Sequence, residues 1–228
     1  MTPDIKQETR HRGAARIYGI FFLLAFISYG TGSTMVDGLA NGADGLAGIF
    51  AKKTTLTIGI ILMAVVHTFV TIGLAIVMLP VLIPYSKTVA YGYGAAAITA
   101  TLVTIVGAMS LLLLVPLSEA YVLAGTDAAY FNALAMLLER GGFVGYQLGM
   151  TLWGLGGLMF CYLLFISNLV PRFFPVWGTA GYVVFMTGTI GELFGYPIGI
   201  MLSVTGGLFE ISLSLWLIFK GFNREATL

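Results

Sequence analysis

The stretch "GGLFEISLSLWLIFKG", residues 206–221, decides the fold class of this chain. Apart from Glu210, it is a run of apolar and small residues that ends at Lys220. About 20 such residues in a helix span the roughly 30 Å hydrocarbon core of a bilayer, since each residue adds about 1.5 Å. Glu210 precedes Lys220 by ten residues, which places its carboxyl group about 15 Å into the membrane. The stretch predicts a membrane helix with an ionisable group near mid-depth.

The composition of the whole chain is that of a membrane protein. Of 228 residues, 58% are hydrophobic and 9% are charged, whereas roughly a quarter of the residues of a soluble domain are charged. The single cysteine excludes an intramolecular disulfide framework. The sequence leaves no room for a phosphate-binding loop or a nucleic-acid module, so we expect no nucleic-acid partner. The lipid bilayer is the partner that the composition predicts directly.

Six apolar runs are long enough to cross a bilayer. They cover residues 17–36, 55–79, 91–117, 143–170, 176–196 and 198–219. We predict an all-α polytopic membrane helix bundle that forms a single transmembrane domain over residues 1–228, with residues 1–16 as a basic cytoplasmic segment. The first run is about 20 residues long, which favours a retained helix over the shorter apolar region of a signal peptide. Little more than Pro197 joins the last two runs, which predicts a tight turn there.

Two outer loops carry helical patterns. The segment "GTDAAYFNALAMLLERGG", residues 125–142, has Thr126 as a helix cap, apolar residues at helical spacing, and two glycines at its end. It predicts a short amphipathic helix at the outer membrane surface. The segment "DGLANGADGLAGIFAKK", residues 37–53, is a weaker version with Leu46, Ile49 and Phe50 on one side. The alternative is that both segments are ordered loops.

Lysine and arginine residues are distributed unevenly between the two sides of the predicted bundle. Cytoplasmic loops of membrane proteins hold an excess of these residues. With the N-terminus inside, the outer side holds Lys52, Lys53 and Arg140, and the cytoplasmic side holds Lys6, Arg10, Arg12, Arg16, Lys87, Arg172, Lys220 and Arg224. This bias predicts that both termini are cytoplasmic.

The face of the last helix that carries Glu210 consists of small residues. Its members one and two turns from the glutamate include Ser203, Gly206, Gly207 and Ser214. Such a face belongs in a helix contact or a cavity and not in lipid. A neutral glutamic acid that ties two helices together is the structural alternative to a functional acid.

A second carboxylate, Glu192, lies about sixteen residues into the fifth helix, in its outer third. Tyr196 lies one turn away, and the nearby small-residue repeat consists of Gly191, Gly195 and Gly199. We predict that the fifth and sixth helices pack closely through these glycines and that Glu192 is the more accessible carboxylate. A structural role for Glu192 is the alternative.

His67 lies about twelve residues into the second helix, on a stripe of small side chains near mid-depth. We predict that His67 and Glu210 face a shared cavity, together with Thr101 or Thr104 of the third helix. The alternative is a histidine that only packs and hydrogen-bonds. Because intramembrane ionisable residues often mark function, the candidates for ligand binding or proton handling are Glu210, Glu192, His67, Ser203, Ser214 and Tyr196.

Several other chemistries lack the residues that they need. One membrane histidine and one cysteine are too few for a haem or metal site, so we expect no metal and no cofactor. No aspartate lies within a predicted span, which excludes an intramembrane protease with two aspartates. A serine nucleophile with His67 as its base lacks any accompanying motif. We assign Tyr18, Trp153 and Trp177 to aromatic belts or packing.

Three stretches carry a family resemblance, namely "AARIYGIFFLLAF" (14–26), "VPRFFPVWGTAGYV" (170–183) and "FEISLSLWLIFKGFN" (209–223). Over nearly its whole length the chain resembles an uncharacterised bacterial integral-membrane family, a domain of unknown function of the 4386 series. The glutamate, tryptophan and Lys-Gly ending of that family's last helix fall on Glu210, Trp216, Lys220 and Gly221. Phe209 stands where the family usually has a small residue, which would narrow a cavity there. The resemblance implies a compact six-helix protein of the bacterial cytoplasmic membrane and supplies no reaction or ligand.

Three functions remain open at this point. The first is binding or movement of a small apolar ligand or a proton, with Glu210 as the buried acid, Glu192 as an outer gate and His67 as a partner. The second is an intramembrane enzyme that uses a protonated carboxyl group as general acid on a lipid or isoprenoid substrate. The third is a non-catalytic subunit or scaffold whose glycine faces form contacts in an oligomer, a homo-oligomer included. The sequence does not decide whether the protein is an enzyme.

Overall fold

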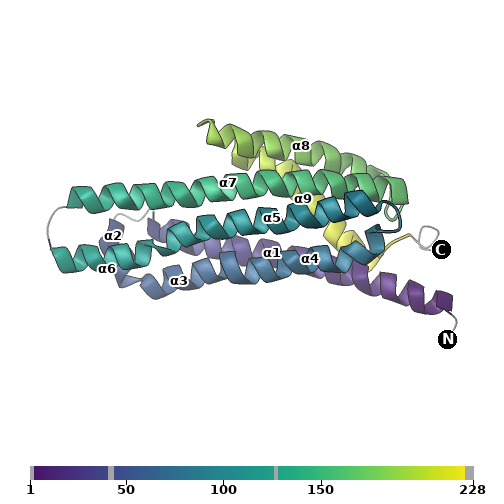
Figure 1. The fold of residues 1–228 in the computed structure, drawn as a ribbon, viewed down its shortest axis with the longest axis horizontal. Helices are drawn as coiled ribbons and strands as arrows, with labels where there is room; N and C mark the ends of the chain where they lie inside the picture. The colour runs from purple at the N-terminus through teal and green to yellow at the C-terminus, as the bar shows by residue number, and fades with distance from the viewer. Residues whose placement is uncertain (1–2, 41–43, 126–127, 224–228) are drawn as a thin grey trace. The chain divides into compact units, whose positions relative to one another are not determined.

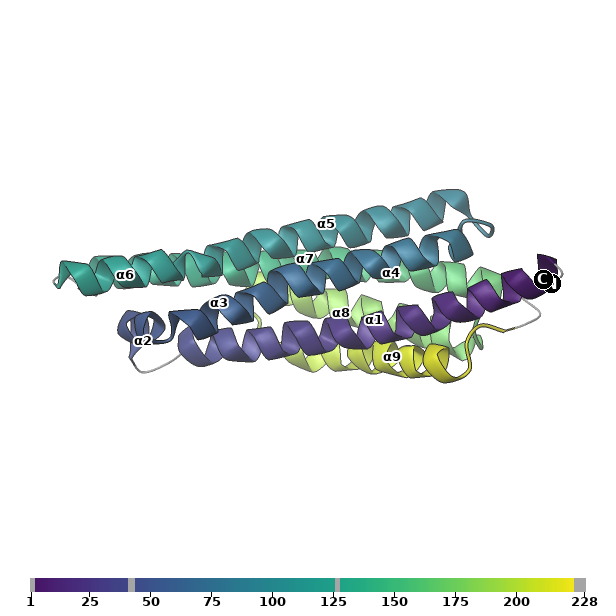
Figure 2. The ribbon, with the colours of Figure 1, turned by 90° about the horizontal axis from the view of Figure 1, so that it is seen from below.

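The computed structural model describes residues 3–40, 44–125 and 128–223, and every regular element among them is a helix (Figures 1 and 2). Six helical stretches are long and apolar enough to cross a membrane, which confirms the predicted fold class. These stretches are Arg12–Leu39, Lys53–Leu82, Lys87–Ala124, Ala129–Ser167, Phe173–Leu193 and Gly199–Phe219. Thr126 and Arg224, used in the predictions above, lie outside the described residues.

The helices keep the labels of Figure 1. In chain order they are α1 (Pro3–Ala40), α2 (Gly45–Ala51), α3 (Lys53–Ile61), the π-helical turn η1 (Leu62–Val66), α4 (His67–Leu82), α5 (Lys87–Leu112), α6 (Leu114–Ala124), α7 (Ala128–Ser167), α8 (Phe173–Leu193) and α9 (Gly199–Phe219). The second span therefore consists of α3, η1 and α4, and the third span consists of α5 and α6. A π-helical turn widens a helix locally and is often found at functional sites.

The loop segments differ in part from their prediction. Residues 37–53 contain α2, whose Leu46 and Ile49 are buried. Residues 128–142 are helical, but they continue into the fourth span as the 40-residue helix α7 instead of forming a separate helix. The third span continues past Leu117, where we predicted its end, to Ala124.

The two glycines that we took as a helix end serve close packing instead. A Cβ atom on Gly142 would lie 2.6 Å from the side chain of Leu111, and one on Gly145 would lie 2.5 Å from the Cα atom of Gly107. The backbones of α5 and α7 thus approach each other where neither helix has a side chain. Gly141 and Gly142 both lie within α7, and side chains at these positions would meet Ser110 and Leu111 of α5.

The chain divides into two compact units. Unit 1 comprises Met1–Leu24, Val70–Thr101 and Gln147–Leu228, and unit 2 comprises Ala25–Phe69 and Leu102–Tyr146. In unit 1, α8 and α9 lie side by side (Figure 1). Gly181 and Gly206 form one of their close contacts, since a Cβ atom on Gly181 would lie 3.2 Å from the Cα atom of Gly206. The last two helices thus pack through glycine at Gly181 and Gly206, and not through Gly195, which we predicted to take part but which lies in the link between them at φ 88° with nothing near its Cβ position.

Unit 2 has a core of its own. Leu46, Ile49, Leu56 and Leu114 belong to its buried cluster, and α2 packs against α6. The ring of Tyr121 on α6 meets that of Phe131 on α7 edge to face at 5.7 Å. Lys53 at the start of α3 and Glu119 on α6 form an ion pair of 2.7 Å between half-exposed side chains.

Large apolar side chains are exposed along the spans. They include Phe69, Ile76, Leu102, Val106 and Met136. Soluble monomers rarely leave so many contiguous apolar side chains in water. In a bilayer these side chains contact lipid, which is the environment that the six spans require.

Gly145→Ala tests the close contact between α5 and α7. The added methyl group would meet the backbone of Gly107 at 2.5 Å, and such overpacking destabilises a protein by about 1–3 kcal/mol. We expect a lower midpoint of thermal unfolding for the purified protein in detergent.

Gly30→Ala is the matched control, because a Cβ atom on this α1 glycine meets nothing within 4 Å. Alanine favours a helix over glycine by about 0.5–1 kcal/mol, so this variant should be at least as stable as the wild type. Equal midpoints for the two variants would contradict the packing role of Gly145.

Candidate functional site

Glu210 lies in the interior of unit 1, as the small-residue face of its helix predicted. Its side chain is 8% exposed. The indole Nε1 of Trp153 on α7 donates to its Oε1 at 3.0 Å, and the hydroxyl group of Tyr182 on α8 donates to the same oxygen at 2.7 Å. One carboxyl oxygen of α9 therefore joins three helices.

The two donors differ in what they can do when Glu210 changes its protonation state. An indole N–H can only donate, whereas a phenol can donate or accept. With an ionised Glu210, Tyr182 donates to the carboxylate. With a neutral Glu210, the acid can donate to the phenol oxygen while Trp153 continues to donate to Oε1. The arrangement therefore accommodates both protonation states without moving the carboxyl group.

The titratable groups around Glu210 come from four helices. Those that interact with it electrostatically are Tyr18 on α1, Tyr93 on α5, Cys161 on α7 and Tyr182 on α8. Phenols and thiols are neutral at pH 7 in their ordinary state. Glu210 thus faces a set of neutral, polarisable side chains.

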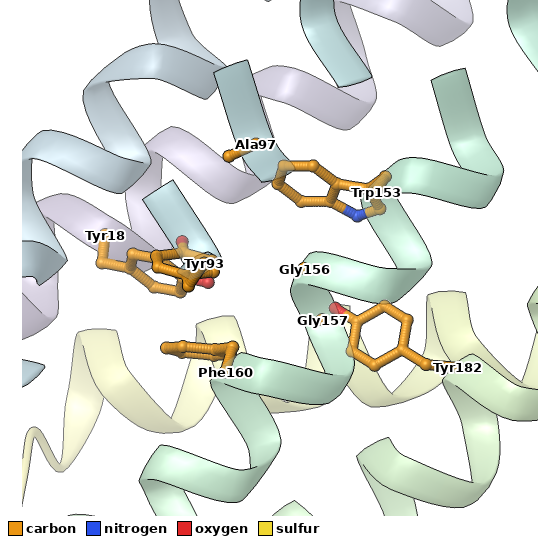
Figure 3. A pocket seen from close by; sticks show the side chains of 8 residues that line it. All are labelled: Tyr18, Tyr93, Ala97, Trp153, Gly156, Gly157, Phe160 and Tyr182. Atoms are coloured by element: carbon orange, nitrogen blue, oxygen red, sulfur yellow. The ribbon is translucent and has the colours of Figure 1, made fainter. Parts of the chain in front are cut away.

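A small cavity of unit 1 lies beside these groups (Figure 3). Its lining residues are Tyr18, Tyr93, Ala97, Trp153, Gly156, Gly157, Phe160 and Tyr182. The space open to the centre of a water molecule is about 10 Å³, close to the least that holds one water. Both donors to Glu210 are therefore also walls of a water-sized cavity.

Glycine makes room for one wall of the cavity. A Cβ atom on Gly157 would lie 2.6 Å from the Cε1 atom of Tyr182. The ring of Tyr182 therefore lies directly on the backbone of α7, where any larger residue would displace it. Figure 3 shows Gly156 and Gly157 between Tyr182 on one side and Tyr18 with Tyr93 on the other.

Glu192 lies at the end of α8 and accepts a hydrogen bond at Oε1 from the backbone N–H of Gly199, at 2.8 Å. Gly199 is the first residue of α9. The first N–H groups of a helix lack partners within the helix and carry partial positive charge, so a carboxylate there is stabilising. The link between the two helices also contains Gly195 at φ 88°, a conformation that favours glycine. Glu192 acts here as a cap for α9.

The serine and tyrosine candidates take ordinary positions. Ser203 donates to the carbonyl oxygen of Ile200 at 2.7 Å, and Ser214 donates to the carbonyl oxygen of Glu210 at 2.7 Å. Tyr196 is exposed. The hydroxyl groups of both serines are thus used within their own helix, and a ligand-binding role for these residues stays a prediction.

His67 belongs to unit 2, directly after the π-helical turn. Its Nδ1 lies 3.2 Å from the carbonyl oxygen of Ala25. The ring of Tyr29 meets its ring edge to face at 5.2 Å and stacks on Tyr146 at 5.3 Å. His67 thus has partners within its own unit, and the cavity that we predicted it to share with Glu210 stays a prediction.

Two aromatic residues do more than the sequence predicted. We assigned Trp153 and Tyr18 to aromatic belts or packing, and both pack in the core of unit 1. In addition, Trp153 donates to Glu210, and Tyr18 lines the cavity. Tyr182 and Tyr93 were not singled out at all. The sequence feature that could have indicated them is a large aromatic residue close to several glycines, as in "WGLGG", residues 153–157.

The described residues hold no group of three or more His, Cys, Asp or Glu side chains that could bind a metal ion.

Removal of the α9 cap should destabilise the protein modestly. Glu192→Ala leaves the Gly199 N–H without its acceptor, and the loss of a helix cap typically costs about 1 kcal/mol. Glu192→Gln keeps an oxygen acceptor at the same position and should retain most of the stability. Thermal unfolding in detergent measures both. An unchanged midpoint in Glu192→Ala would show that the bond to Gly199 contributes nothing.

Comparison with known proteins identifies the family. No curated protein and no solved structure matches the chain. The family described as "Domain of unknown function (DUF4386)" matches residues 17–221, which include Glu210 and both of its hydrogen-bond donors. Because the match covers most of the 228 residues, it confirms the resemblance seen in the sequence. The chain is a multi-pass membrane protein that belongs to the DUF4386 family.

Proposed function

We propose that the protein binds and releases a proton at Glu210, inside the membrane. The observation that carries this proposal is the geometry of one oxygen atom. Glu210 Oε1 is held by an indole at 3.0 Å and by a phenol at 2.7 Å. The phenol can reverse its hydrogen bond when the carboxyl group takes up a proton.

The surroundings of Glu210 act on its two protonation states in opposite directions. Burial disfavours the charged carboxylate, whereas two donors to its oxygen favour it. A structural carboxyl group in the membrane interior also needs hydrogen-bond donors. A group that must gain and lose a proton needs both states to be accessible, and this arrangement supports that role.

The size of the cavity favours a proton over the other ligand that we considered. A space of about 10 Å³ beside Glu210 holds no more than about one water. A small apolar ligand or an isoprenoid chain would need several times that volume.

Further elements of the proposal concern the other candidates. Glu192 and Tyr196 would lie at the outer end of α8, with both termini of the chain in the cytoplasm. His67 would be a second proton-binding group, in unit 2. The π-helical turn before it and its contact with Ala25 O at 3.2 Å support a role that depends on the orientation of its ring.

Glu210→Gln tests the proposal. The full chain is purified, placed in lipid nanodiscs and titrated with base while its infrared spectrum is recorded. We expect the wild type to lose a carboxyl C=O stretching band as Glu210 ionises. The variant should lack this band at every pH, because an amide does not titrate in this range.

Two features keep this experiment interpretable. Glutamine retains an oxygen that can accept from Trp153 and Tyr182, so the variant should fold. Glu192→Gln is the control, and its titrating band should match that of the wild type. A wild-type titration in Glu210→Gln would exclude Glu210 as the proton-binding group.

A further inference from the structure

One hydroxyl group that lines the cavity has no well-formed hydrogen bond. Tyr93 on α5 is 2% exposed, and its Oη meets the geometric requirements of a hydrogen bond with no described residue, although the hydroxyl group of Tyr18 lies near enough to interact with it. A buried hydroxyl group that is left unpaired is destabilising, and most buried polar groups in native proteins are paired with protein or with ordered water. The ring of Tyr93 is fixed by stacking on Phe160 at 5.3 Å. This hydroxyl group is therefore held in place.

The cavity supplies what a buried water molecule needs. Such a water usually forms two to four hydrogen bonds and requires a space of about one water-sized sphere. The hydroxyl groups of Tyr18, Tyr93 and Tyr182 all belong to lining residues, and the space of about 10 Å³ meets the size requirement. Tyr182 donates its own proton to Glu210, so its oxygen is left to accept from another donor.

We propose that this cavity binds a single water molecule, which connects the hydroxyl group of Tyr93 to that of Tyr182 and so extends the hydrogen-bonded chain that begins at Glu210. The placement of the side chains supports this chain, because Tyr93 and Tyr182 lie on opposite sides of Gly156 and Gly157 (Figure 3). The role of the chain rests on the proposed function, since it is the route by which a proton reaches Glu210.

The transfer along this chain balances at every atom. Tyr182 gives its proton to Glu210 Oε1 and receives one from the water. The water receives the proton of Tyr93, and Tyr93 receives the proton that a hydronium ion of the aqueous phase gives up as it becomes water. Each intermediate oxygen ends with the number of protons that it had, and Glu210 gains one. No electron is transferred and no further reactant is needed.

Trp153 and Tyr182, the two lining residues that donate to Glu210, have different roles in the proposed proton transfer. Trp153 holds Oε1 and cannot pass a proton on, since an indole N–H has no acceptor function. Tyr182 both holds Oε1 and passes the proton. Tyr93 does not touch Glu210 in this scheme and acts on it only through the water and Tyr182.

Two variants test the proposed hydrogen-bonded chain, one by removing a hydroxyl group and the other by filling the cavity. Tyr93→Phe removes the hydroxyl group and keeps the ring that stacks on Phe160. Ala97→Val keeps every hydroxyl group but fills the cavity, because Ala97 is a lining residue that is 2% exposed. Tyr91→Phe and Ala95→Val are the matched controls, since both residues lie on the exposed side of α5.

The measurement is the rate at which the Glu210 carboxyl band changes after a rapid pH jump, with the full chain in lipid nanodiscs. We expect Tyr93→Phe and Ala97→Val to slow this change by about 10²-fold, the lower end of what a positioned proton-transfer group contributes. Both controls should keep the wild-type rate. In H₂¹⁸O, an O–H stretching band of the bound water should shift in the wild type and be missing in Ala97→Val.

The outcomes separate the two proposals. A band that titrates and changes at the wild-type rate in both variants would overturn the water-mediated chain and leave Glu210 as the proton-binding group. Slowing in Tyr93→Phe alone would overturn the role of the water, because the cavity would then be dispensable. A Glu210 band that does not titrate in the wild type would overturn the proposed function itself.

Discussion

A carboxyl group in the interior of a membrane helix must find hydrogen-bond partners, because neither lipid nor apolar side chains can replace water around it. In unit 1 this requirement is met by Trp153 on α7 and Tyr182 on α8, both of which donate to Glu210 on α9. The three helices are thereby fixed around one oxygen atom. Gly157 serves the same requirement, because its lack of a side chain leaves the room that the ring of Tyr182 needs to reach Glu210.

The same residues connect structure to the proposed chemistry. Aromatic side chains with a polar atom can contribute to an apolar core and still donate or accept a hydrogen bond. A cavity lined by tyrosines and a tryptophan is therefore compatible with a hydrocarbon environment while it offers polar atoms to a proton. Serine or threonine hydroxyl groups are less suited to this position, because in these helices they bond to their own backbone, as Ser203 and Ser214 do.

Much of the fold follows from the sequence, because length and apolarity alone specify a membrane-spanning helix. The six spans were predicted on that basis, and the buried position of Glu210 was predicted from the small residues on its face of the last helix. The continuity of α7 was not, since Gly141 and Gly142 have the sequence pattern of a helix end and only the neighbouring α5 explains them. The partners of Glu210 were also missed, because they lie 57 and 28 residues away in the chain. The periodic spacing of residues along a helix does not reveal pairs that are so far apart in the chain. The residues of the cavity could be found only once the helices were placed within unit 1.

The α8–α9 hairpin is joined at three levels along its length. Glu192 binds Gly199 where the helices meet, Tyr182 binds Glu210 farther along, and Asn223 after α9 binds the turn before α8, through Leu169 O at 2.8 Å and Asn168 O at 2.7 Å. A helix pair held at one level can rotate or slide, but a pair held at three levels has a fixed register. The hydrogen bond that changes direction in the proposed protonation of Glu210 is thus the middle one of the three, and the bonds at the two ends of the hairpin hold the register of α8 and α9 in either protonation state.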